Sequence, residues 1–250
     1  MQDNAVFYVK NPSPFIFNML NEPSDQLLFG WKVTCIGNAS DNKIYCKTDY
    51  GYSGYIDAES ITNTEYITTH KIVSRFCPVL ENPDYTKKLL MTLPYGSKIR
   101  ILSSDEKFSK ADIFGKICYV PSAHISPDEN TKKTPQDIID TASKYLDTPY
   151  LWGGKTPLGI DCSGLCFMAY YLNGITIYRD ARFPFYEEYA VKQDDLRPSD
   201  LIFYKGHMAL YIGGGKIIHS NSRDGKATVS TVDTEHIVGC ASLYELLEKE

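Results

Sequence analysis

The first half of the sequence contains one pattern twice. An apolar run, a glycine turn and an alternating segment, "QLLFGWKVTCI", precede a glycine-led segment, "GYSGYIDAESI", within residues 26–61. The same order returns as "KLLMTLPYGSKIRIL" and "GKICYVPSAHI" within residues 88–125, in a more degenerate copy. Short runs of Thr, Tyr, Val and Ile that are broken by Gly, Pro, Asn and Asp are typical of strands. A repeat of about 60 residues therefore predicts two small all-β barrels, over residues 1–66 and 67–127.

A third domain is predicted over residues 128–250. The segment 127–134, "PDENTKKT", is polar and aperiodic, as linkers are. Thr134, Pro135 and Asp137 then supply a capping side chain, a preset φ and an acid in the first turn, which together predict a helix start. The apolar residues that follow fall on one helical face; they are Ile138, Ile139, Ala142, Tyr145 and Leu146.

The rest of this domain predicts one more helix and then a sheet. A helix is expected over 162–173, ended by Asn173–Gly174. Its apolar stripe comprises Leu165, Met168, Ala169 and Leu172. After Asp200 the segments "DLIFYKG", "HMALYIGGGKIIHS" and "ATVSTVD" are rich in strand-forming residues, with Gly213–Gly215 as a hairpin turn. Helices followed by an antiparallel sheet make an α+β domain.

The composition argues against several classes of partner. The net charge is −5 and no long basic run occurs, so no nucleic-acid partner is expected. No apolar stretch approaches the ~20 residues that cross a bilayer, and residues 1–14 lack the features of a signal peptide. The seven cysteines are irregularly spaced, unlike a disulfide framework, which favours a cytoplasmic protein. An exported protein whose signal peptide had been removed would have the same sequence.

Cys162, in "GIDCSGLC", is either a packing residue or a nucleophile. Free cysteines are most often small buried hydrophobes. At the first turn of a helix, however, unpaired N–H groups and the helix dipole stabilise a thiolate, which predicts a lowered thiol pKa. Ser163 and Gly164 leave the backbone amides open to hold an oxyanion. Asp161 caps the helix, contacts the substrate, or does both.

A cysteine nucleophile needs a base and a group that orients the base. His207 opens one predicted strand and His219 ends the next. If Gly213–Gly215 form the turn between them, the two histidines lie near the same end of the hairpin. One can then take the thiol proton while the other orients it. The alternative for each is a structural imidazole, which is the only interpretation we give His70, His124 and His236.

Several of these segments resemble the NlpC/P60 cysteine peptidases of bacterial cell-wall metabolism. The resemblance rests on "TPYLWGGKTPLGIDCSGLC" and "RPSDLIFYKGHMALYIGGGKIIHS", and it covers residues 134 to about 245. The N-terminal half resembles two bacterial SH3 (SH3b) domains. With "RDA" at 179–181, the order most resembles the γ-D-glutamyl-L-diamino acid endopeptidases, or dipeptidyl-peptidases VI. Ser199 stands where the family has Gly, and Pro184 where this subgroup often has Gln.

The resemblance implies a papain-like catalytic domain in which Cys162 is the nucleophile, His207 the general base and His219 the orienting residue. Such an enzyme cleaves the γ-D-Glu to diamino acid bond of murein stem peptides through a thioester and releases L-Ala-γ-D-Glu in cell-wall peptide recycling. It requires a substrate with a free N-terminal amine, which we expect near Asp161. We expect a monomer that uses no cofactor or metal and does not bind a membrane. The substrate contacts it implies are Tyr150, Trp152, Asp161, Ser163, Arg179 and Asp180, with Tyr52 from the first β domain.

Alternative interpretations remain open at this point. A zinc module could use Cys162, Cys166, His207 and His219, although their spacing fits structural zinc sites poorly. A general endopeptidase acting on intact wall, or a non-catalytic SH3b protein that binds wall peptide, would also contain these segments. Some predicted contacts have structural alternatives: Tyr150 and Trp152 as cover for the helix start, Arg179 and Asp180 as a surface ion pair, Gly153–Gly154 as a turn, and Tyr52 as an ordinary barrel residue.

Overall fold

The computed structural model describes residues 4–38, 42–128 and 133–248. The chain divides into two compact units, Met1–Glu129 and Asn130–Glu250. Residues 129–132, the middle of the predicted linker, lie outside the described residues.

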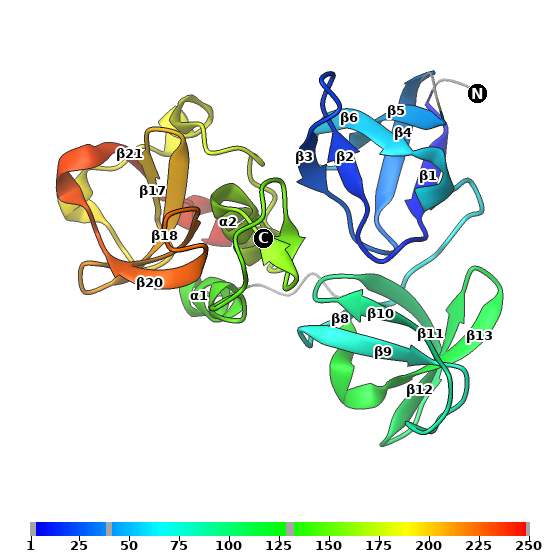
Figure 1. Ribbon diagram of the computed structural model, residues 1–250. Helices are drawn as coiled ribbons and strands as arrows, with labels where there is room; N and C mark the ends of the chain where they lie inside the picture. Colours follow the sequence, from blue (N-terminus) through cyan, green and yellow to red (C-terminus); the bar gives the residue numbers. More distant parts are fainter. Residues whose placement is uncertain (1–3, 39–41, 129–132, 249–250) are drawn as a thin grey trace. The chain divides into compact units, whose positions relative to one another are not determined.

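The first unit consists of two antiparallel sheets of seven strands each, with the same strand order (Figure 1). The first sheet contains β1 (Val6–Val9), β2 (Phe15–Phe17), β3 (Pro23–Gln26), β4 (Lys32–Asn38), β5 (Lys43–Thr48), β6 (Ser53–Asp57) and β7 (Ile61–Thr62), in the order β3-β2-β6-β5-β4-β1-β7. The second contains β8 (His70–Ile72), β9 (Phe76–Leu80), β10 (Leu89–Pro94), β11 (Lys98–Ser104), β12 (Phe108–Ile113), β13 (Lys116–Pro121) and β14 (Ile125–Pro127), in the order β10-β9-β13-β12-β11-β8-β14.

The two sheets are copies of one topology, because each position in the second order is the strand seven places later in the chain. A single 3-10 turn follows the sixth strand of each copy, as η1 (Ala58–Ser60) and η2 (Ser122–His124). The predicted pair of all-β domains is therefore confirmed.

The copies meet closely within this unit. Trp31, which is buried, donates from Nε1 to the carbonyl of Gly96 at 3.0 Å. The backbone N–H of Lys98 donates to the carbonyl of Phe29 at 2.8 Å. Gly30 has φ +78°, and a Cβ there would lie 2.2 Å from the Lys98 carbonyl oxygen. Only glycine fits this crossing, since it tolerates positive φ and has no side chain.

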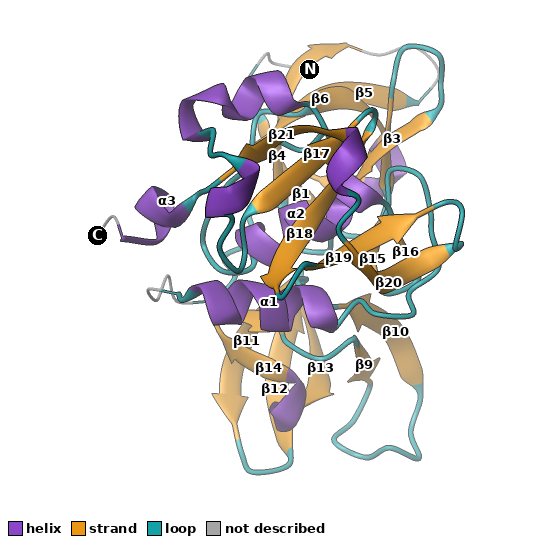
Figure 2. Ribbon diagram, turned by 90° about the vertical axis from the view of Figure 1, so that its left-hand side faces the viewer, coloured by secondary structure: helices purple, strands orange, loops and turns teal. Residues whose placement is uncertain are grey.

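The second unit is a five-stranded antiparallel sheet with helices packed on it (Figures 1 and 2). The strands are β17 (Leu201–Tyr204), β18 (His207–Gly213), β19 (Lys216–Asn221), β20 (Lys226–Thr231) and β21 (Ile237–Ala241), in the order β20-β19-β18-β17-β21. Helix α2 (Cys162–Tyr171) packs against β18 and β19, and α1 (Pro135–Ser143) packs against α2. Smaller elements complete it: β15 (Lys155–Thr156), β16 (Gly159–Ile160), η3 (Phe183–Tyr189), η4 (Gln193–Asp195), η5 (Thr234–His236) and α3 (Tyr244–Glu248).

Helix α1 begins as the sequence predicts. The hydroxyl of Thr134 accepts the backbone N–H of Asp137, and the Asp137 carboxylate accepts the backbone N–H of Thr134 at 2.8 Å. This reciprocal capping satisfies two N–H groups that the helix leaves unpaired, and Pro135 occupies the first helical position. The predicted apolar face is buried, except that Leu146, beyond the helix end, is half-buried.

Helix α2 corrects the sequence-based interpretation. It begins at Cys162 as predicted but ends at Tyr171, before the positive φ of Gly174 at +80°. The predicted apolar stripe is buried, and so is every other residue from Cys162 to Tyr170, which the sequence did not indicate. The sheet covers one side of the helix and α1 another, so no face is left for solvent.

The hairpin that carries both histidines is confirmed. Strands β18 and β19 pair antiparallel with Leu210 opposite Ile218, and all three glycines of the turn, Gly213–Gly215, have positive φ. The sequence did not predict β21, which pairs with β17 on the opposite side from β18.

All seven cysteines carry free, buried thiols. No helix within residues 4–38, 42–128 and 133–248 has the length and apolar character needed to traverse a bilayer.

Candidate active site

Cys162 is the first residue of α2 and only 6% exposed. The backbone N–H groups of Met208 and Ser163 act on the sulfur in the direction that lowers the thiol pKa. The thiol lines a cavity of about 380 Å³ together with His207 and His219. The three residues that the sequence nominates for catalysis are therefore gathered around one cavity.

The two histidines are direct neighbours. His207 Nε2 lies 2.9 Å from His219 Nδ1, and the ring planes are inclined by 66°. The Gly213–Gly215 turn makes this possible, because it folds β19 back beside β18 and returns the chain to the end where His207 lies. With Nε2 engaged by His219, the other ring nitrogen of His207, Nδ1, is the one left to act on the thiol.

Burial keeps both imidazoles neutral near pH 7. Desolvation, and then the neighbouring His219, lower the pKa of His207 to about 4. Desolvation also lowers the pKa of His219, against the opposing effect of Asp224. A neutral His207 is ready to accept a proton.

The thiol itself does not behave as the sequence suggests. Burial, and next the Asp161 carboxylate, raise the pKa of Cys162 to about 11, although the backbone N–H groups and Arg179 act in the opposite direction. The predicted lowering of this pKa is wrong, because desolvation outweighs the helix N-terminus. The site at rest therefore holds a neutral thiol and a neutral imidazole, and the proton must transfer as the sulfur attacks.

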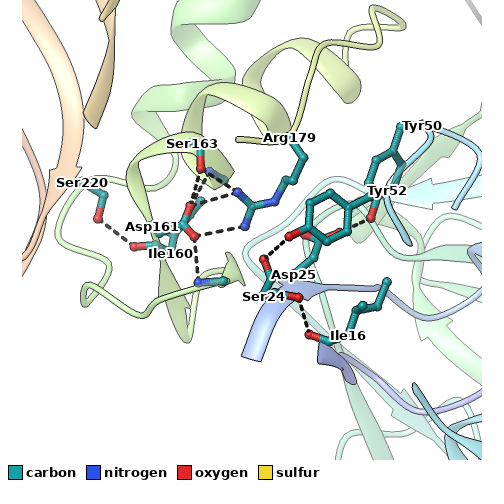
Figure 3. Close-up of polar contacts among 12 residues, drawn as sticks. Ile16, Ser24, Asp25, Tyr50, Tyr52, Ile160, Asp161, Ser163, Arg179 and Ser220 are labelled. Atoms are coloured by element: carbon teal, nitrogen blue, oxygen red, sulfur yellow. Dashed lines mark hydrogen bonds and ion pairs between the residues drawn. The ribbon is translucent and has the colours of Figure 1, made fainter. Parts of the chain in front are cut away.

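Asp161 organises the residues around the nucleophile (Figure 3). It caps α2 by accepting the backbone N–H of Gly164 on Oδ1, and it accepts the backbone N–H of Gly153 on Oδ2 at 2.7 Å. The Ser163 hydroxyl donates to Oδ1 at 3.2 Å. Arg179 donates Nη1 to Oδ1 at 3.2 Å and Nη2 to Oδ2 at 3.1 Å. All of these residues are buried.

This network changes the roles expected for Asp161 and Arg179. The Asp161 carboxylate receives five hydrogen bonds, about as many as its oxygen lone pairs accommodate. We therefore expect it to hold the helix start in place, while its contact with the amine of a substrate stays a prediction. Arg179 is 2% exposed, so the alternative of a surface ion pair with Asp180 is wrong.

Two close backbone approaches fix the nucleophile segment. A Cβ at Gly164 would lie 2.2 Å from the carbonyl oxygen of Gly154, and one at Gly154 would lie 2.4 Å from that of Gly159. In addition, the buried Ser220 hydroxyl donates to the Ile160 carbonyl at 2.7 Å (Figure 3). Since Ser220 follows His219 in β19, this bond ties the histidine strand to the chain just before the nucleophile.

The other predicted contacts lie in different environments. Tyr150 lines the cavity, and burial followed by Cys162 and Asp161 raises its pKa to about 12. Trp152 is 66% exposed and does not line the cavity, while Asp180 is half-buried. Tyr52 belongs to the first unit, where its hydroxyl donates to the Ser24 carbonyl at 3.2 Å (Figure 3). Substrate contact by Tyr52 stays a prediction.

Sequence reasoning missed two cavity residues that bond to His219. Ser230 Oγ lies 2.9 Å, and Asn221 Nδ2 3.2 Å, from His219 Nε2. Ser230 is in β20, within the predicted strand 227–233, but only the register of β19 against β20 reveals that it reaches His219.

The described residues do not support the zinc alternative, which used Cys162, Cys166, His207 and His219. Cys166 is fully buried one turn into α2. Within the ranges that the structure describes, no group of three or more His, Cys, Asp or Glu side chains is placed to hold a metal ion.

A family model and several known proteins match this chain. Residues 147–239 match the model of the NlpC/P60 family. Dipeptidyl-peptidase 6 of Lysinibacillus sphaericus is 34% identical over 232 residues, which are 85% of this chain and 85% of that protein. The γ-D-glutamyl-L-lysine dipeptidyl-peptidase of Bacillus subtilis is 30% identical over 230 residues, 85% of this chain and 76% of that protein.

A solved structure extends the likeness to the whole fold. The crystal structure of an NlpC/P60 family protein from Bacillus cereus superimposes with a TM-score of 0.83 at 19% identity, over 95% of this chain and 99% of that one. The likeness covers both units of this chain, so the two proteins share one fold. On the match of residues 147–239 and the near full-length similarity to these relatives, the chain belongs to the NlpC/P60 family.

Proposed function

We propose that this chain is a cysteine peptidase that hydrolyses the γ-D-glutamyl to diamino acid bond of murein stem peptides and releases L-Ala-γ-D-Glu. The observation that carries the proposal is the cavity shared by Cys162, His207 and His219. A thiol next to a neutral, oriented imidazole is the arrangement that acyl transfer through a thioester requires.

The reaction begins with proton transfer. His207 Nδ1 takes the thiol proton while the Cys162 sulfur attacks the scissile carbonyl carbon. The negative charge that develops on the carbonyl oxygen is stabilised by backbone N–H groups at the start of α2. His207 returns the proton to the departing amine as the C–N bond breaks, which leaves a thioester on Cys162.

Water completes the cycle. His207 takes a proton from a water molecule that attacks the thioester carbonyl, and the thiol recovers its proton as the C–S bond breaks. His219 keeps the His207 ring in one orientation through both halves, since their nitrogens are 2.9 Å apart.

The relatives support the choice of substrate. Two proteins similar over 85% of this chain are named dipeptidyl-peptidase 6 and γ-D-glutamyl-L-lysine dipeptidyl-peptidase. A dipeptidyl-peptidase releases two residues from a free N-terminus, which motivates our proposal that this enzyme also requires an unblocked L-Ala. Such a requirement restricts it to released peptides, in a recycling role in the cytoplasm. The seven free thiols support that location, because oxidising compartments favour disulfides.

The test is mass spectrometry of the products from L-Ala-γ-D-Glu-diamino acid tripeptides, free and N-acetylated, with Cys162→Ala as the control. We expect L-Ala-γ-D-Glu from the free peptide and a kcat/KM lower by about 100-fold or more for the acetylated one, since a buried ammonium contact is worth a few kcal/mol. Equal rates on both peptides would indicate a general wall endopeptidase. Binding without any cleavage would indicate a wall-peptide-binding protein.

A further inference from the structure

The hydrogen-bonded chain of the active site does not end at His219. His207 Nε2 and His219 Nδ1 are 2.9 Å apart, and His219 Nε2 and Ser230 Oγ are also 2.9 Å apart. In the β19–β20 pairing, Ile217 lies opposite Ser230 and His219 opposite Thr228, so His219 and Ser230 are diagonal neighbours on one face of the sheet. His219 is 7% exposed, and its ring nitrogens therefore depend on these protein partners.

The tautomer of His219 decides whether His207 can act as a base. A neutral imidazole carries one proton on one of its two nitrogens. For Nδ1 of His207 to accept the thiol proton, Nε2 of His207 must carry the ring proton and donate it to His219 Nδ1. His219 must then carry its own proton on Nε2, where it needs an acceptor.

Asn221 cannot be that acceptor. Its Oδ1 accepts the backbone N–H of Asp224 at 2.7 Å, and its Nδ2 donates to the Asp224 carboxylate at 2.9 Å. This fixes the amide with its nitrogen toward His219 Nε2, at 3.2 Å. An amide nitrogen only donates, so Asn221 favours the opposite tautomer, in which Nε2 carries no proton.

We propose that Ser230 is a positioning residue whose hydroxyl oxygen accepts the Nε2 proton of His219 and so selects the tautomer in which His207 Nδ1 is available to the Cys162 thiol. The proposal rests on the proposed function, in which His207 is the base. Asn221 keeps its bonds to Asp224 in this arrangement.

The experiment compares Ser230→Ala with Ser230→Thr in the full chain. Without the hydroxyl, Asn221 is left as the partner of His219 Nε2 and the ring proton moves to Nδ1. We expect Ser230→Ala to lower kcat by about 100-fold, the low end of what general base catalysis contributes, at unchanged KM. Ser230→Thr retains a hydroxyl and should recover most of the activity.

The second readout needs no activity. Long-range 1H–15N spectra of 15N-histidine protein distinguish a protonated from an unprotonated ring nitrogen. We expect His219 to be protonated at Nε2 in the wild type and at Nδ1 in Ser230→Ala. Thr228→Ala is the matched control. Thr228 lies on β20, the strand of Ser230, and is opposite His219, but its hydroxyl faces the Val229 carbonyl. It should change neither the tautomer nor kcat.

Two outcomes overturn the proposal: a wild-type His219 protonated at Nδ1, or a Ser230→Ala variant with wild-type kcat. Failure of the proposed function looks different. It would appear as a wild-type chain that does not cleave the tripeptides, while the tautomer spectra would still report on Ser230.

Discussion

The guanidinium of Arg179 donates to both carboxylate oxygens of Asp161, at 3.2 and 3.1 Å. Both side chains are buried, and Asp161 directly precedes the nucleophile Cys162. The same guanidinium donates to the Ser163 hydroxyl at 2.7 Å. The planar guanidinium thus connects the carboxylate and the hydroxyl at the start of α2, and the same carboxylate accepts the backbone N–H of Gly153.

Removing Arg179 should therefore destabilise the second unit. Arg179→Ala leaves the Asp161 carboxylate buried without its cation, which typically costs about 3 to 5 kcal/mol. Arg179→Lys loses the two-nitrogen fork and should recover only part of this loss. Calorimetry of the unfolding transitions measures both. Arg223→Ala is the matched control, since Arg223 pairs with Asp224 at 3.4 Å with its side chain 83% exposed, and it should cost less than about 1 kcal/mol. Equal stability of Arg179→Ala and Arg223→Ala would contradict the role of the buried pair.

Cys162 should be distinguishable from Cys166, one turn further along α2. Cys162→Ala is expected to lower kcat by several orders of magnitude, because the residual rate comes only from binding and oxyanion contacts. Cys166→Ala also removes a buried thiol but lies outside the cavity, so kcat should be retained. Steady-state kinetics on the tripeptide decide the matter, with circular dichroism as the check on folding. More than about a tenth of wild-type kcat in Cys162→Ala would exclude it as the nucleophile.

The pH dependence of kcat/KM should be broad. Activity requires neutral His207, whose pKa is lowered to about 4, so the acid limb should fall near pH 4 rather than near 6.5. The alkaline limb should follow the thiol, whose pKa is raised to about 11. Because the two groups interact, the limbs report the pair rather than either residue.

The lowered pKa of His207 also makes the free energy of unfolding depend on pH. The folded His207 binds a proton less readily than the unfolded chain does, so its contribution to the free energy of unfolding is complete above about pH 6.5 and is lost as the pH falls toward 4.

His219→Ala should raise the pH of the acid limb of kcat/KM, since His219 contributes to the lowering of the His207 pKa, and it should leave measurable activity. An acid limb at about pH 6.5 in the wild type would show that His207 is solvated.

Local patterns predicted a large part of this molecule. The two β domains follow from a repeat of apolar runs and glycine turns, and the start of α1 follows from Thr134, Pro135 and Asp137, because turns and caps depend on near neighbours in the chain. The proximity of His207 and His219 also follows from one glycine turn.

What the sequence left undetermined depends on tertiary context. The burial of α2 on all sides depends on what packs against it, and the contact of Ser230 with His219 depends on strand register. The sign of the Cys162 pKa shift is a competition between burial and the helix N-terminus, and only the degree of burial decides it.

Ser199 stands at a backbone conformation that suits glycine. Its φ is +78°, in the left-handed region, where a Cβ costs about 1 to 2 kcal/mol. Its carbonyl accepts the buried Tyr170 hydroxyl and its N–H donates to the Tyr211 carbonyl at 2.8 Å, so the surrounding bonds hold this conformation in place. Ser199→Gly should therefore stabilise the second unit by about 1 kcal/mol, less the backbone entropy that glycine loses on folding. Ser199→Ala is the control, because it removes the same buried hydroxyl but keeps the Cβ, so Ser199→Gly should be the more stable of the two variants. Thermal unfolding compares the three proteins, and a Ser199→Gly variant less stable than Ser199→Ala would show that the backbone is not strained there.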